Sequence, residues 1–152
     1  MIVLLDTGPL GLITNANKKN REAVQCNEWI RYLLRNYVSV YVPEIAYYEL
    51  RRKHVHLKNK QVIERLDNFV NSPGIGYAPI TTEIIVKAST LWGWARLTGQ
   101  QTAHDEAIDA DVILAATAII MALEGEPVVI ATTNVSDLAR YTPAKNWEDI
   151  RL

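Results

Sequence analysis

The chain has 152 residues, 49% of them hydrophobic and 22% charged, which predicts a single globular domain spanning residues 1–152 with a core of its own. The formal net charge of −1 excludes a strong overall positive charge of the kind typical of nucleic-acid-binding proteins, although 11 of the 16 Lys and Arg residues lie between Lys18 and Arg65. The single cysteine, Cys26, excludes an internal disulfide and a cysteine-rich zinc site, and it fits a cytoplasmic protein.

The first half of the chain alternates strands with helices. The apolar run 2–5 predicts a strand rather than a signal peptide, and the Asp-Thr-Gly-Pro sequence after it predicts a turn into a helix. Apolar residues at helical spacing predict a second helix over 23–36, and alternation over 38–42 predicts a strand. Pro43 then opens another helix. A further helix is expected over 60–70 and a short strand over 76–80.

The second half continues this alternation. Thr81 or Thr82 is the expected N-cap of a helix over 84–97, which Gly99 ends. Residues 100–107 are polar and predict a loop, whereas 109–123 predict a buried helix whose apolar part is too short to cross a bilayer. Residues 127–131 are almost wholly apolar, as in a strand covered on both faces. The pattern therefore predicts an α/β sandwich around a mainly parallel sheet.

Four acidic residues stand at the edges of apolar runs: Asp6, Glu49, Asp111 and Asp137. Asp6 ends the first predicted strand and Asn134 follows the last strong one, so both lie at the carboxyl edge of the sheet, where α/β proteins bind ligands. Glu49 and Asp111 are expected near the starts of the helices that follow. Carboxylates gathered there repel one another unless a divalent cation neutralises them, which predicts a Mg²⁺ or Mn²⁺ site.

Each of these acids also has a simpler interpretation. Asp6 is in a favoured N-cap position, and one oxygen cannot easily serve both a cap and a metal. Glu49 has a basic partner at helical spacing in Arg52 or Lys53. Glu44 competes with Glu49 as the functional acid, but a helix dipole alone would favour an acid in that first turn.

The two later pairs are ambiguous in a different way. Asp109 and Asp111 point about 200° apart on a continuous helix, so both can reach one cation only if Asp109 precedes the first turn. Asn134 and Asp137 have the spacing of a reciprocal capping pair. The histidines His54, His56 and His104 lack metal-ligand spacing, the four tryptophans are expected in the core or an interface, and no P-loop, nucleophile elbow or dinucleotide motif is present.

The patterns LLDTGPL, YYEL, DADVILAATA and TTNVSDLARY, in this order, resemble a PIN domain, most nearly the VapC-type toxin ribonucleases. The resemblance covers essentially the whole chain. It implies a three-layer α/β/α sandwich that binds Mg²⁺ or Mn²⁺ and hydrolyses RNA phosphodiester bonds by in-line attack of water. It also implies a homodimer inhibited by a cognate antitoxin protein.

By motif matching, Asp6, Glu49 and Asp111 take the three principal acidic positions. Many members have a fourth acid directly after the threonines, where this chain has Asn134, so Asp137 is the candidate for the missing charge. Two alternatives remain open: a weak or silent PIN-like module that binds RNA or protein, and an RNA-processing nuclease outside a toxin–antitoxin pair. The candidate catalytic residues are Asp6, Glu49, Asp111 and Asp137, and the candidate metal ligands are Asp6, Glu49, Asp109, Asp111, Asn134 and Asp137.

Overall fold

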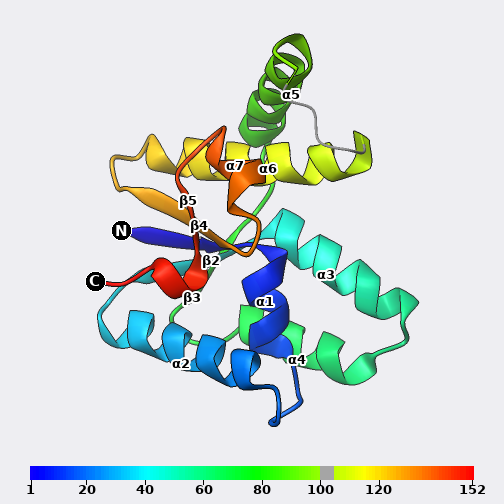
Figure 1. Ribbon diagram of the computed structural model, residues 1–152, viewed down its shortest axis with the longest axis vertical. Helices are drawn as coiled ribbons and strands as arrows, with labels where there is room; N and C mark the ends of the chain where they lie inside the picture. Colours follow the sequence, from blue (N-terminus) through cyan, green and yellow to red (C-terminus); the bar gives the residue numbers. More distant parts are fainter. Residues whose placement is uncertain (100–104) are drawn as a thin grey trace.

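The computed structural model describes residues 1–99 and 105–152, with side chains for 1–99 and 109–152. Its centre is a five-stranded parallel sheet in the order β3-β2-β1-β4-β5 (Figure 1). The strands are β1 (Ile2–Leu5), β2 (Ser39–Pro43), β3 (Ile75–Ala78), β4 (Val128–Thr132) and β5 (Ala144–Asn146). The first four confirm the predicted strands to within two residues. The edge strand β5 was not predicted, because its sequence Ala-Lys-Asn has no apolar run.

The central strands β1 and β4 are buried along their whole length, as their continuous apolar sequences predict for strands covered on both faces. Successive side chains along a strand point to opposite faces of the sheet. Val3 and Leu5 contribute to one apolar cluster, whereas Ile2 and Leu4 contribute to another on the opposite face. The sheet therefore separates two cores, and the predicted three-layer α/β/α sandwich is confirmed.

The helices fall on both sides of this sheet. One face is covered by α1 (Thr7–Thr14), α2 (Arg21–Arg35), α3 (Glu44–His56) and α4 (Lys60–Val70). The other face is covered mainly by α6 (Asp105–Ala122), with α7 (Val135–Ala139) beside it. Helix α5 (Thr82–Leu97) packs on α6 through a third apolar cluster and projects from the body of the molecule (Figure 1). A short 3₁₀ turn, Trp147–Asp149, follows β5.

One expected boundary was wrong, and it matters for the site. Helix α6 begins at Asp105 rather than at Asp109, so 105–107 are helical instead of part of a loop; residues 100–104 of the expected loop lie outside the described part of the chain. The sequence there combines acids, favourable at a helix N-terminus, with alanine, a strong helix former. The apolar residues at helical spacing begin only at Val112, so the sequence pattern placed the start of the helix too late.

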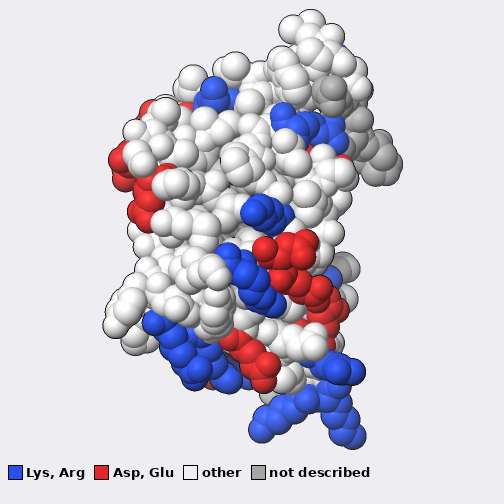
Figure 2. Space-filling model, turned by 60° about the vertical axis from the view of Figure 1, so that its left-hand side comes forward, with Lys and Arg blue, Asp and Glu red and all other residues white. Residues whose placement is uncertain are grey.

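The surface agrees with the nearly neutral composition. On the face shown in Figure 2, basic and acidic side chains lie side by side, and no single basic field covers it. Among the described residues, no helix is long and apolar enough to span a membrane. The free thiol of Cys26 is buried, and burial raises its pKa to about 12.

Candidate functional site

Asp6 is the best-anchored acid of the candidate site. It follows β1 directly, so the buried strand holds its backbone rigidly. Its Oδ1 accepts the backbone N–H of Thr7 at 2.7 Å and caps α1, while its Oδ2 accepts the Thr132 hydroxyl at 2.7 Å. Oδ1 also accepts the Thr7 hydroxyl at 3.3 Å, so the second lone pair of Oδ2 is the position left for a metal. The cap and a metal contact are therefore compatible, contrary to the expectation from sequence.

Glu49 lies on α3, in its second turn rather than near the helix start as expected. Its carboxylate is 3.9 Å from the Arg52 guanidinium, so the predicted helical ion pair is present. Burial, and then the negative charge of Asp6, raise the pKa of Glu49, whereas Arg52 lowers it. Glu49 thus lies within the electrostatic reach of Asp6 even though the two residues come from different elements.

Glu44, the competing acid, already has structural partners. Its Oε2 accepts the Tyr77 hydroxyl at 2.7 Å and its Oε1 accepts the backbone N–H of Ile80 at 3.1 Å. These bonds join the start of α3 to β3 and the segment that follows it. Both carboxylate oxygens of Glu44 are therefore used within the fold, which favours Glu49 as the functional acid.

Asp111 lies in the second turn of α6, again further into the helix than expected. Burial is the main cause that raises its pKa from 3.8 to about 7, and the charges of Asp6, Asp137 and Glu49 raise it further, against a lowering by Arg140. Three carboxylates, from Asp6 after β1, Glu49 on α3 and Asp137 on α7, therefore act on Asp111 on α6. Acids gathered in this way raise one another's pKa values, and a bound cation would lower them again.

Asp109 is not among the acids that act on Asp111, so the structure does not support the prediction that it shares an ion with them. Because α6 begins four residues earlier, both aspartates lie within the continuous helix and point to different sides. Asp109 is exposed and lines a hollow beside α5 with Ile85 and Trp92.

The two candidates for the fourth position lie at the start of α7: Asn134 directly before the helix and Asp137 in its first turn. The Asn134 amide donates a hydrogen bond to Asp137 Oδ2, and Arg140 donates to Asp137 Oδ1 at 3.3 Å. The Asn134 side chain makes no capping bond to the backbone, so the reciprocal capping arrangement is absent. Asp137 reaches the cluster from the first turn of α7.

Thr132 and Arg140 are structural members of the site that the sequence did not single out. Thr132 is fully buried; its hydroxyl donates to Asp6 and accepts the backbone N–H of Asn134 at 2.9 Å. It thereby connects the ends of β1 and β4. The position of Thr132 at the end of an apolar strand, and the three-residue spacing of Asp137 and Arg140, were the available signals.

The donor set fits Mg²⁺ or Mn²⁺, since it consists of carboxylate, amide and hydroxyl oxygens without a cysteine or histidine at its centre. Within residues 1–99 and 109–152, no three His, Cys, Asp or Glu side chains already lie at metal-binding separation. Mutual repulsion between the carboxylates favours such spacing when no cation offsets it.

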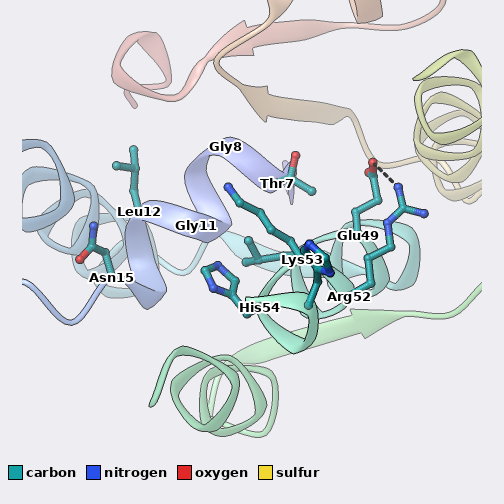
Figure 3. A pocket seen from close by; sticks show the side chains of 11 residues that line it. Thr7, Gly8, Gly11, Leu12, Asn15, Glu49, Arg52, Lys53 and His54 are labelled. Carbon is teal, nitrogen blue, oxygen red and sulfur yellow. Dashed lines mark ion pairs between the residues drawn. The ribbon is translucent and has the colours of Figure 1, made fainter. Parts of the chain in front are cut away.

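A cavity of about 890 Å³ opens beside Glu49, between α1 and α3 (Figure 3). Lys53, His54 and His56 line its α3 side, so a basic hollow adjoins the acidic cluster. Burial and the charge of Lys53 lower the pKa of His54.

The remaining histidine, His104, lies outside the described residues. Trp29 and Trp147 pack together in the core at 5.6 Å between ring centroids, as predicted, whereas Trp92 and Trp94 are partly exposed on α5.

Comparison with other proteins gives information on the fold. No family model and no curated protein matches the sequence. Among solved structures, VapBC2 from Rickettsia felis, bound to a promoter DNA fragment, matches with a TM-score of 0.74 and 17% identity over 97% of this chain and 99% of that chain. VapBC-1 from nontypeable Haemophilus influenzae matches with a TM-score of 0.70 and 17% identity over 98% and 100% of the two chains.

A third similar structure is VapC20 from Mycobacterium tuberculosis, described as a toxin that cleaves the sarcin–ricin loop. It has a TM-score of 0.57 and 9% identity over 91% of this chain and 94% of that chain. The similarity extends over almost the full length in all three cases, and at these identities it concerns the fold. The chain therefore has the PIN-like α/β/α fold of the VapC toxins.

Proposed function

We propose that this protein is a divalent-metal-dependent endoribonuclease and the toxin of a type II toxin–antitoxin pair. The observation that carries the proposal is that Asp6, Glu49 and Asp137, from separate elements of the fold, lie close enough to the partly buried Asp111 to raise its pKa beyond the rise that burial causes. A fold that holds four acids within reach of one another bears a repulsive cost, which a bound cation would offset. The PIN-like fold supports the same conclusion.

In this proposal Asp6, Glu49 and Asp111 hold one Mg²⁺ or Mn²⁺ ion, and Asp137 with Asn134 supports water or a second, weaker ion. When bound, the ion supplies positive charge against the negative charge that develops on the phosphate. The carboxylates accept hydrogen bonds from the attacking water and orient it in line with the leaving oxygen. The oxygen of water bonds to phosphorus as the bond to the leaving oxygen breaks, so the protein forms no covalent intermediate.

The basic cavity beside Glu49 supports RNA as the substrate. Arg52, Lys53 and His56 line it, and Lys53 extends toward α1 (Figure 3). Basic side chains there are suited to contact the phosphates that flank the cleaved bond, and such contacts position a nucleic acid without reading its sequence. The VapBC neighbours support an antitoxin as the protein partner. The homodimer is proposed from the resemblance of the sequence motifs to VapC-type toxins alone.

The test is cleavage of a single-stranded RNA in Mn²⁺ by the wild-type protein and by Asp111→Ala. Removal of this carboxylate is expected to abolish metal-dependent cleavage, because Asp111 is the acid on which the charges of the other three converge. Asp109→Ala is the matched control on the same helix and should cleave as the wild type does. Equal rates for Asp111→Ala and the wild type would refute the assignment.

A second candidate is a PIN-like module that binds RNA or protein without cleaving. It is favoured by the existing bonds of Asp137 to Asn134 and Arg140, which compete with a metal contact. Calorimetric titration with Mn²⁺ separates the two functions, since a silent module shows no heat that depends on Asp6 and Asp111. A nuclease outside a toxin–antitoxin pair would cleave equally but lack an antitoxin that co-purifies and inhibits it.

A further inference from the structure

A second hollow lies on α3, on the other side of Arg52 from the basic cavity. It has a volume of about 430 Å³, and Tyr47, Tyr48 and Tyr77 contribute three aromatic rings to its wall, with Val55 alongside. We call it the tyrosine hollow. Arg52 lines both this hollow and the basic cavity, so it stands at the boundary between them.

Most polar groups around the tyrosine hollow are already paired within the fold. The Tyr47 hydroxyl donates to Asp67 at 2.7 Å, Arg51 donates to the same carboxylate, and the Tyr77 hydroxyl donates to Glu44. What the hollow still offers a ligand is therefore mainly aromatic surface. A flat ring with apolar faces therefore suits this hollow better than a ligand that must form several hydrogen bonds.

Tyr48 provides the accessible ring. It is 55% exposed, although large aromatic side chains are usually well buried, and the Arg52 guanidinium lies 5.0 Å from its ring centroid. An exposed tyrosine ring can stack on the face of a nucleobase, and an arginine nearby can add a cation–π contribution.

The position of Tyr48 relative to the acidic cluster points to a specific occupant. Tyr48 immediately precedes Glu49, and Arg52 joins the two by its ion pair with Glu49 and its contact with the Tyr48 ring. A base stacked on Tyr48 would therefore lie beside Arg52, whose guanidinium also faces the Glu49 carboxylate. The basic cavity then lies ahead for the following phosphates.

We propose that the tyrosine hollow binds one unpaired base of the RNA next to the cleaved phosphodiester, by stacking on Tyr48. This inference rests on the proposed ribonuclease function. Since the neighbouring hydroxyls and carboxylates are occupied, the hollow holds the base without distinguishing its identity. It selects for an unpaired nucleotide, because a base within a duplex has no free face to offer.

The test measures binding of a short fluorescent single-stranded RNA in EDTA, where cleavage does not interfere. Tyr48→Ala is expected to weaken binding by about 5- to 150-fold, the range for loss of one base–aromatic stack. Tyr48→Phe keeps the ring and should bind within about twofold of the wild type. Tyr37→Ala is the control, since Tyr37 is 95% exposed and lies before the amino end of β2, whereas α3 follows the carboxyl end of that strand.

Stacking itself is read with RNA that carries 2-aminopurine, whose fluorescence is quenched when it stacks. Quenching by the wild type and by Tyr48→Phe, but not by Tyr48→Ala, supports the inference. Equal affinity and quenching for Tyr48→Ala and the wild type overturns it, as does a wild-type protein that binds no RNA.

These outcomes are separable from the nuclease assay. A wild type that cleaves in Mn²⁺, with Tyr48→Ala binding normally, refutes the base site and leaves the ribonuclease assignment in place. A wild type that never cleaves but loses RNA binding with Tyr48→Ala refutes the ribonuclease assignment and retains the base site.

Discussion

Replacement of Asp111 by asparagine should stabilise the metal-free protein at high pH. Aspartate titrates near pH 4 in an unfolded chain, whereas burial and the neighbouring acids raise the pKa of Asp111 to about 7 in the fold. Between these two values the folded protein keeps a proton that the unfolded chain has lost. The free energy of unfolding therefore falls as pH rises from about 4 to about 7.

The size of the effect follows from the two pKa values. A rise from 3.8 to about 7 corresponds to about 4 kcal/mol if the carboxylate were fully shielded from water. Because the side chain is only partly buried, solvent screens the neighbouring charges, and we expect about 2 kcal/mol. In a chain of this length that difference raises the melting temperature by about 4–8 °C.

The assay is thermal unfolding in EDTA at pH 5 and pH 8, for the wild type, Asp111→Asn and the control Asp109→Asn. The gain of Asp111→Asn over the wild type should be larger at pH 8 than at pH 5, and Asp109→Asn should show no such gain, because Asp109 is exposed and outside the cluster. Excess Mn²⁺ should stabilise the wild type at pH 8. An Asp111→Asn protein no more stable than the wild type at pH 8 would refute the electrostatic argument.

Two further substitutions test the supports of the site and of the sheet. Thr132→Val removes the hydroxyl that donates a hydrogen bond to Asp6. It should weaken Mn²⁺ binding, measured by calorimetry, by about 10- to 100-fold, which is the usual effect of losing a partner of a metal ligand. Unchanged affinity would contradict a role for Thr132 in orienting Asp6. Gly76→Ala would place a methyl carbon 2.5 Å from the Tyr41 ring and should cost about 1–3 kcal/mol in urea unfolding. The control is Gly93→Ala, inside α5, where an added Cβ meets no atom within 4 Å; this change should stabilise the folded protein by about 0.5–1 kcal/mol. A Gly76→Ala protein of wild-type stability would show that the Tyr41 ring can move freely.

Local pattern predicted the elements well where one periodicity dominates. The helix at 60–70 was predicted with the bounds that α4 has, and Thr81 caps α5 through a bond to the Ile84 N–H. The two failures, β5 and the start of α6, are segments whose sequences carry little apolar signal. The strand β5 forms because β4 offers it an edge to pair with, and that edge exists only in the folded sheet.

The sequence by itself determined that acids follow or flank apolar elements in an alternating α/β chain, because hydrophobic periodicity and strand-end chemistry are local properties. Which acids meet was decided only by the tertiary structure. The strand order brings β1 beside β4, so that Thr132 reaches Asp6 across 126 residues of sequence. Because α6 begins at Asp105, Asp109 and Asp111 both lie within one continuous helix and point to different sides of it. The packing of α6 on the sheet through Leu114 and Ala118 then decides which of the two aspartates faces the cluster.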